Sequence, residues 1–243
     1  MKKIICFIPL NYPNNVFFNY FINNIMKYGI DFIEIGIPYI DSIADGNIVS
    51  NSYKFLIKNY NIKNFFNSVY NFKLINNINI VIIMSYYNPI IQFNEYNFVY
   101  LLNLLKIDSI LIIDYNLECN NFLYKISKKK KINFINFISC NISNKKNFFL
   151  NKFFLYFNYF SYIKGITGDK KFKKVKYLNN YLKKLNYFIF GFGLSNLKDI
   201  IFMKKIKNFV FGSFIIYLIN KYYFNYKKIF KMIKIISFIN KNI

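Results

Sequence analysis

Eight short apolar runs, each separated from the next by a longer segment, restrict the fold of this chain more than any other feature. The runs predict β-strands at residues 4–8, 32–36, 78–85, 109–113, 133–138, 159–163, 188–191 and 209–211. The segments between them predict amphipathic helices at residues 16–28, 51–67, 96–105, 120–128, 175–185 and 222–240. Eight such units in 243 residues fit an α/β fold of the (β/α)8 TIM barrel type, which usually needs about 250. An open, doubly wound sheet is the alternative.

The composition limits the expected partners and location. The net charge of +24 comes from Lys alone, because the chain contains no Arg, and these lysines are scattered as in an A+T-rich coding sequence. Without Arg or a basic face carrying aromatic residues, we expect no nucleic-acid partner. No apolar stretch reaches the ~20 residues of a membrane span, and three irregularly spaced cysteines favour a reducing, cytoplasmic location. No linker divides the sequence, so we expect one domain over residues 1–243.

Residue types that are rare in this chain gather at the ends of the expected strands. Residues 34–46 read EIGIPYIDSIADG and contain the only Ala, and residues 165–169 read GITGD and contain the only Thr. GFGLS at residues 191–195 begins at the end of the seventh strand, and GS at residues 212–213 follows the last. Because the active site of a parallel barrel lies at the carboxyl ends of its strands, these four segments predict the site.

Two carboxylates in the first of these segments are the candidate catalytic groups. Side chains alternate along a strand, so Glu34 is expected to point into the barrel while Ile33 and Ile35 face the helices. A carboxyl group among apolar walls suits proton transfer near neutral pH, and Asp45 in the following loop can share that work. For Asp41 and Asp45, helix capping or turn formation is the structural alternative.

Glycines after the last three strands predict a phosphate-binding site. Backbone N–H groups after strands seven and eight of such barrels often hold phosphate, helped by a helix N-terminus. Gly191, Gly193, Gly212 and Ser213 occupy that location, and residues 165–168 come from the neighbouring loop. With no His and no CxxC spacing, we expect no metal site. The residues alone therefore indicate an acid–base enzyme that acts on a small phosphate ester.

In their order and spacing, these segments resemble the tryptophan synthase alpha chain family, whose signature reads E-L-G-x-P-[FY]-S-D-P-x-A-D-G. The family patterns M-x-Y-Y-N-P-I, G-V-T-G, G-F-G-I-S and G-S are similar to residues 84–90, 165–168, 191–195 and 212–213. The first strand end (residues 7–13) and residues 108–118 are also similar to the family pattern. The resemblance runs the length of the chain and suggests an A+T-biased version of the kind found in endosymbionts.

The resemblance implies a carbon–carbon lyase of tryptophan biosynthesis, which cleaves indole-3-glycerol phosphate to indole and glyceraldehyde 3-phosphate. It implies that Glu34 transfers protons and that Asp45 binds the indole N–H and stabilises its developing positive charge. The remaining implied residues are phosphate ligands (Gly168, Gly193, Gly212 and Ser213), an indole pocket (Phe7, Leu111, Phe137 and Tyr159) and loop support (Asp41 and Thr167).

The resemblance also implies a beta chain as partner, in an α2β2 complex. That partner would hold pyridoxal phosphate and convert indole to tryptophan, while this chain would need no cofactor. The loop after the second strand and the segment around residues 88–89 would face it. The sequence departs from the family pattern at Ser42 and Asn116, where Pro is usual, and at Tyr12, where Asp is usual. It also has Ile163 where some members carry Arg.

Other functions fit parts of the sequence. Lys164 follows the sixth strand, where aldolases that form a Schiff base carry their lysine, but Lys is too frequent here for one position to be informative. A catalytically weak subunit that mainly binds and activates the beta chain is a second alternative, because the departures from the family pattern concern loop rigidity, partner contacts and turnover. A basic nucleic-acid-binding protein is the third, and the scattered Lys argue against it.

Overall fold

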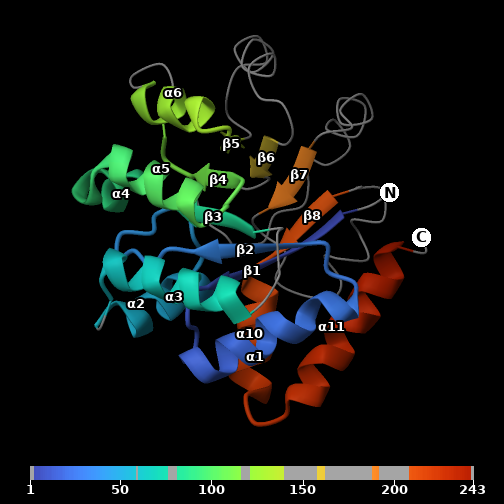
Figure 1. Cartoon of the computed structure of the whole chain (residues 1–243). Helices are drawn as coiled ribbons and strands as arrows, with labels where there is room; N and C mark the ends of the chain where they lie inside the picture. Colours follow the sequence, from blue (N-terminus) through green and yellow to red (C-terminus); the bar gives the residue numbers. More distant parts are fainter. Residues whose placement is uncertain are drawn as a thin grey trace.

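The expected strands form a closed parallel barrel. The computed structural model describes residues 3–58, 60–75, 81–115, 121–139, 158–161, 188–191 and 208–241, and every structural statement below refers to these. The strands pair in chain order from β1 to β8, and β1 pairs in parallel with both β2 and β8. The TIM-barrel prediction is therefore confirmed, and the open-sheet alternative is wrong (Figure 1).

Strand positions follow the apolar runs closely. Wherever a strand boundary lies within the described residues, it falls within one residue of the expected position. The strands are β1 (Lys3–Pro9), β2 (Phe32–Gly36), β3 (Val81–Ser85), β4 (Ser109–Ile112), β5 (Asn133–Ser139), β6 (Asn158–Ser161), β7 (Phe188–Gly191) and β8 (Asn208–Phe211).

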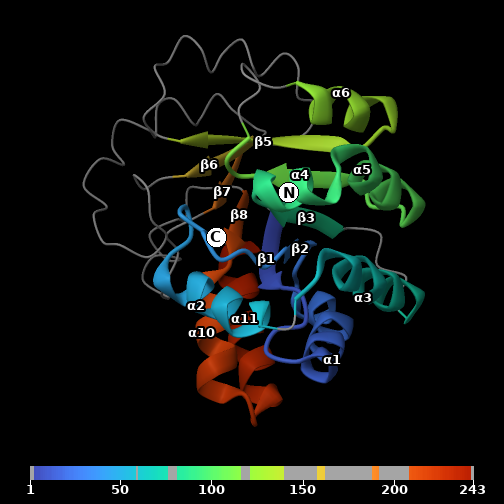
Figure 2. The same cartoon turned by 90° about the vertical axis from the view of Figure 1, so that its left-hand side faces the viewer.

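Helices cover the outside of the barrel. Figures 1 and 2 show α1, α10 and α11 on the side of β1 and β8, and α4, α5 and α6 on the side of β3, β4 and β5. The described helices are α1 (Asn15–Ile25), the 3-10 helix η1 (Met26–Tyr28), α2 (Asn47–Ile57), α3 (Ile62–Ile75), α4 (Tyr87–Phe93), α5 (Glu95–Leu104), α6 (Phe122–Lys129), α10 (Ser213–Tyr222) and α11 (Tyr226–Lys241). None of these described helices is both long and apolar enough to cross a membrane.

Two helix predictions differ from the structure. The single helix expected over residues 51–67 is wrong, because α2 and α3 are separate helices. The Asn61 side chain accepts a hydrogen bond from the Lys63 N–H at 2.8 Å, which starts a new helix. Helix α4 was not expected, although its Pro89 lies in the first turn, where proline is tolerated. The helix expected over residues 175–185 lies outside the described residues.

Alternation along the strands separates the two faces of the barrel. Ile33 and Ile35 are fully buried on the face toward the helices, as expected. On the opposite face, Phe7 of β1 pairs with Glu34 of β2, which pairs with Ile82 of β3. The fold therefore brings a carboxylate and an aromatic ring together toward the carboxyl ends of neighbouring strands.

Candidate active site

Glu34 lies in β2 between two strands that fix its backbone. It is 2 % exposed, and its neighbours in the sheet register are Phe7 and Ile82. Side chains paired in this way point to the same face of a sheet, so Glu34 lies on the inner face with apolar register neighbours on both sides. The position expected from sequence alternation agrees with this register.

Phe7 links the end of β2 with the end of β8. A Cβ added to Gly36 would lie 2.7 Å from a ring carbon of Phe7, and a Cβ added to Gly212 would lie 3.0 Å from another. Both glycines therefore make room for one ring, because a side chain at Gly36 would overlap it and one at Gly212 would press against it. This contact brings a candidate indole-pocket residue beside a candidate phosphate-binding residue.

Asp45 lies in the loop between β2 and α2 and is 7 % exposed. The Tyr86 hydroxyl donates a hydrogen bond to Asp45 Oδ2 at 2.8 Å and accepts one from the Ala44 N–H at 3.1 Å. Burial raises the pKa of Asp45 to about 7, although the Tyr86 hydrogen bond acts in the opposite direction. The carboxyl group can therefore change its protonation state near neutral pH.

The two aspartates of this loop have different surroundings. Asp41 is exposed, and its carbonyl accepts a hydrogen bond from the Ile43 N–H at 2.8 Å. The Asp45 N–H donates to the Ser42 carbonyl at 3.1 Å, which turns the chain back toward the barrel. The backbones of both aspartates thus take part in turns, as the structural alternative expects, but only the Asp45 side chain is buried.

Sequence reasoning missed two tyrosines beside these carboxylates. Tyr86 stands at the end of β3, within a segment already noted for its family resemblance. Tyr53 of α2 is buried, and its hydroxyl lies 2.6 Å from where a Cβ on Gly36 would be. Burial, followed by the charge of Asp45, holds the Tyr53 pKa well above its ordinary value, so its phenol stays protonated.

Tyr53 had only a weak sequence signal. It lies four residues after Val49, and both are buried on the same side of α2. This spacing marks a core position on a helix, but it cannot show that the hydroxyl reaches the end of β2. Its hydrogen-bond acceptor in the described structure is the Met84 sulfur at 4.0 Å, which is a weak one.

The remaining indole-pocket candidates are arranged by strand register. Leu111 is fully buried in β4 and pairs with Met84 and Ile135. Phe137 of β5 is partly buried and pairs with Tyr159 of β6. Parity along β4 and β5 places Leu111 and Phe137 on the same face as Glu34.

Gly212 and Ser213 stand where β8 passes into α10. Gly212 is the N-cap residue of this helix, and its carbonyl accepts the Ile216 N–H at 3.1 Å. Ser213, the first helical residue, is buried. The first N–H groups of a helix have no partners inside it, and they carry the positive end of the helix dipole. This end of α10 can therefore bind an anion.

Several predicted site residues lie outside the described residues. They are Gly168, Gly193 and Thr167, together with Lys164 of the Schiff-base alternative. Among the residues that are described, no group of three or more His, Cys, Asp or Glu could hold a metal ion.

Comparison with known proteins identifies relatives over the length of the chain. The family model for the tryptophan synthase alpha chain matches residues 1–240. The tryptophan synthase alpha chain of Karelsulcia muelleri is 32 % identical over 235 residues, which cover 95 % of this chain and 92 % of that one. That of Pelagibacter ubique is 33 % identical over 201 residues, which cover 79 % of this chain and 74 % of that one.

Solved structures show the same fold. The tryptophan synthase alpha chain of Legionella pneumophila superposes with a TM-score of 0.85 at 19 % identity, covering 100 % of this chain and 92 % of that one. The tryptophan synthase a2b2 complex of Pyrococcus furiosus contains a chain with a TM-score of 0.80 at 20 % identity, and both chains are covered completely.

Proposed function

Because this chain belongs to the tryptophan synthase alpha chain family, we propose that Glu34 and Asp45 are its catalytic carboxylates. As a member of that family it is an indole-3-glycerol-phosphate lyase, which releases indole and glyceraldehyde 3-phosphate for tryptophan biosynthesis. The observation that carries the residue assignment is the burial of both carboxylates near the end of β2, with Phe7 beside Glu34 in the register and the Tyr86 hydroxyl bonded to Asp45.

Glu34 is the proton-transfer group in this proposal. The carbon–carbon bond of indole-3-glycerol phosphate breaks after a proton is added to indole C3, which leaves an electron-poor ring. Removal of the proton from the adjacent glycerol hydroxyl then sends its electrons into a new carbonyl, and the bonding pair returns to the indole. A single carboxyl group in an apolar site can give the first proton and take the second. The strand neighbours Phe7 and Ile82 supply that surrounding.

Asp45 stabilises the ring while it carries positive charge. An ionised carboxylate beside the indole N–H lowers the energy of the cationic intermediate, and the effect is largest where water is excluded. The Tyr86 hydrogen bond holds the carboxylate in one orientation. Its pKa of about 7 predicts that this contribution increases as the pH rises through neutrality.

The phosphate-binding end is assigned to Gly212 and Ser213 with Gly168 and Gly193. The indole pocket is assigned to Phe7, Leu111, Phe137 and Tyr159, and loop support to Asp41 and Thr167. The contact of Phe7 with both Gly36 and Gly212 supports this arrangement, because it joins the two ends of a substrate-sized site.

A beta chain is the proposed partner, in an α2β2 complex in which that chain holds the pyridoxal phosphate and receives the indole. Three apolar residues support a protein interface beside the Asp45 loop: Ile40, Ile43 and Ile91 are 54 %, 74 % and 52 % exposed. The Asn88 side chain donates to the Tyr39 hydroxyl at 3.0 Å, which joins this loop to α4. The relative from Pyrococcus furiosus was solved as an a2b2 complex.

The proposal includes one domain over residues 1–243 and a cytoplasmic location. Pairing of the first strand with the last supports the single domain. Cys6, a buried free thiol, fits a reducing compartment.

Indole release tests the proposal directly. The reaction is measured with indole-3-glycerol phosphate for the wild type and Glu34→Gln, each with and without the cognate beta chain. Glu95→Gln is the matched control, because this glutamate lies in α5 and accepts a hydrogen bond from Tyr87 away from β2. Activity lost only in Glu34→Gln supports the assignment.

The same experiment decides the alternative of a partner-activating subunit. If the wild type releases no indole even with the beta chain, while still stimulating that chain, binding is the main function. Stimulation that survives in Glu34→Gln shows that catalysis and activation are separate.

A further inference from the structure

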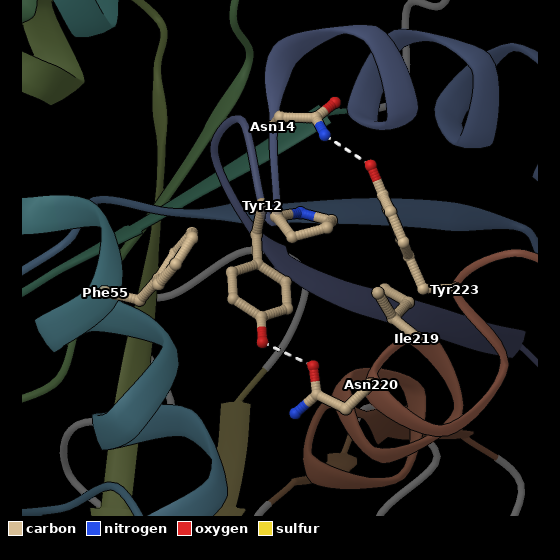
Figure 3. Close-up of a pocket in the computed structure, with 7 residues that line it drawn as sticks. Tyr12, Asn14, Phe55, Ile219, Asn220 and Tyr223 are labelled. Atoms are coloured by element: carbon tan, nitrogen blue, oxygen red, sulfur yellow. Dashed lines mark hydrogen bonds between the residues drawn. The ribbon is translucent and has the colours of Figure 1, made fainter.

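A cavity of about 450 Å³ lies outside the barrel, between the β1–α1 loop, α2 and α10. We name it the Tyr12 pocket. Its described lining consists of Tyr12, Pro13, Asn14, Phe55, Ile219, Asn220 and Tyr223 (Figure 3). Volumes between about 300 and 1,000 Å³ are typical of small-molecule sites.

The Tyr12 pocket is separate from the catalytic carboxylates. Phe55 follows Tyr53 by two residues on α2, and residues two apart on a helix face different directions. Tyr53 is buried against Gly36 and Phe7, whereas Phe55 is 63 % exposed and lies beside Tyr12 in Figure 3. One helix therefore serves the catalytic site with one residue and the Tyr12 pocket with another.

No charged residue is among the residues that line this pocket, although the chain has a net charge of +24. Three of the seven are aromatic, and the rings of Tyr12 and Phe55 meet edge to face with centroids 6.1 Å apart. A phosphate ester would find no cation among these residues, whereas a flat, uncharged ring would find aromatic side chains to pack against.

Polar atoms of the lining are already oriented. The Tyr12 hydroxyl donates to Asn220 Oδ1, and the Asn14 amide donates to the Tyr223 hydroxyl. Each tyrosine oxygen keeps further hydrogen-bonding capacity after these contacts, since a hydroxyl can both donate and accept. The lining can thus accept a ring N–H as well as pack against its faces.

We propose that the Tyr12 pocket binds an uncharged aromatic heterocycle of the size of indole. Neutrality, aromatic walls and oriented hydroxyl groups agree with this class of ligand, and the volume of about 450 Å³ is large enough for it. The choice of indole as the compound to test rests on the proposed function, because indole is a product of that reaction. Tyr12 stands where Asp is usual in the family, and an aspartate would replace an aromatic wall with a charge.

Indole binding can be measured by the fluorescence of indole itself, because the chain contains no Trp. Titration of the wild type is expected to give two sites, one in the barrel and one in the Tyr12 pocket. Phe55→Ala is expected to give one site. Phe122→Ala is the matched control, since Phe122 of α6 is 50 % exposed and does not line the pocket, and it is expected to keep two.

Two further variants complete the test. Tyr12→Phe keeps the ring and removes only the hydroxyl, so it decides the question if Phe55→Ala does not fold; binding at the second site is expected to weaken about 3- to 10-fold. Glu34→Gln is expected to lose cleavage of the substrate yet keep both indole sites. Its cleavage assay therefore tests the proposed function, and its indole titration tests the Tyr12 pocket. One site in the wild type, a second site filled only at millimolar indole, or two unchanged sites in Phe55→Ala and Tyr12→Phe would overturn the proposal.

Discussion

Glu34 and Asp45 reach the same end of the barrel by different routes. Glu34 belongs to a strand, and its place is set by the hydrogen-bonded register with β1 and β3. Asp45 belongs to a loop, and its carboxylate is held by a phenol 41 residues away in sequence. The sheet therefore positions the strand residue, whereas the position of the loop residue depends on one particular side chain elsewhere in the chain.

The largest expected effect concerns the strand residue. Glu34→Gln keeps the shape of the side chain but cannot exchange the proton, so kcat is expected to fall about 10³-fold, within the usual range for loss of an acid–base group. Indole release measures this, and thermal unfolding checks that the fold is retained. Activity within tenfold of the wild type would contradict the role given to Glu34.

Gly36→Ala tests how tightly the end of β2 is packed. The added methyl group would lie 2.6 Å from the Tyr53 hydroxyl and 2.7 Å from the Phe7 ring. Such overlap in a closed site is expected to lower the free energy of unfolding by about 2–3 kcal/mol. Urea unfolding measures the change.

Gly212→Ala is the control for this packing, because its added methyl group would come no closer than 3.0 Å to the Phe7 ring. We expect it to cost about 1 kcal/mol or less. Equal losses in the two variants would show that packing at the end of β2 is not the cause.

Asp45→Asn tests the cost of burying the loop carboxylate. Because burial raises the folded-state pKa to about 7 from 3.8, the folded protein binds more protons than the unfolded chain between these values. Stability from this group is therefore present at low pH and is lost as the pH rises toward about 7. The variant has no such loss, so its stability relative to the wild type is expected to rise by about 2–3 kcal/mol between about pH 5 and about pH 8.

Urea unfolding of both proteins at about pH 5 and about pH 8 measures this difference. The advantage of Asp45→Asn should shrink at the lower pH. A difference independent of pH would mean that the carboxylate is not the titrating group.

The smallest expected effect concerns the hydrogen bond that holds the loop carboxylate, which Tyr86→Phe removes. The Tyr86 hydrogen bond lowers the pKa of Asp45 against the effect of burial, so its loss should raise that pKa further. The pH at which kcat/KM reaches half its maximum is expected to move upward, with about a tenfold loss at neutral pH.

Tyr87→Phe is the matched control, since its hydroxyl donates to Glu95 at 2.8 Å and not to Asp45. Its pH profile should equal that of the wild type. A profile shifted equally by both variants would remove the special role of Tyr86.

The same contrast explains what could be predicted from the sequence. Strand positions follow from the apolar runs, because strands of a parallel barrel are buried on both faces, and the inward direction of Glu34 follows from alternation along β2. The break between α2 and α3 was missed, because Asn61 acts as a cap in a chain where Asn is everywhere. Tyr86 and Tyr53 matter through contacts between distant segments, which periodicity does not encode.

The glycine pattern was informative in a similar way. Gly36 and Gly212 were recognised as part of the site, but the reason for them is a third residue, Phe7, that fills the space of both missing side chains. The sequence shows where side chains are absent, and only the fold shows what occupies the gap.

That shared ring has a consequence for how the chain can change. Phe7 touches the end of β2 on one side and the start of α10 on the other, so its ring packs against both the proton-transfer end and the anion-binding end of the site. A smaller residue at this position would loosen both ends together, and a larger one would push both apart. Adaptation to a shorter or longer substrate therefore begins at one aromatic side chain in β1, and Gly36 in particular cannot gain a side chain while that ring is in place.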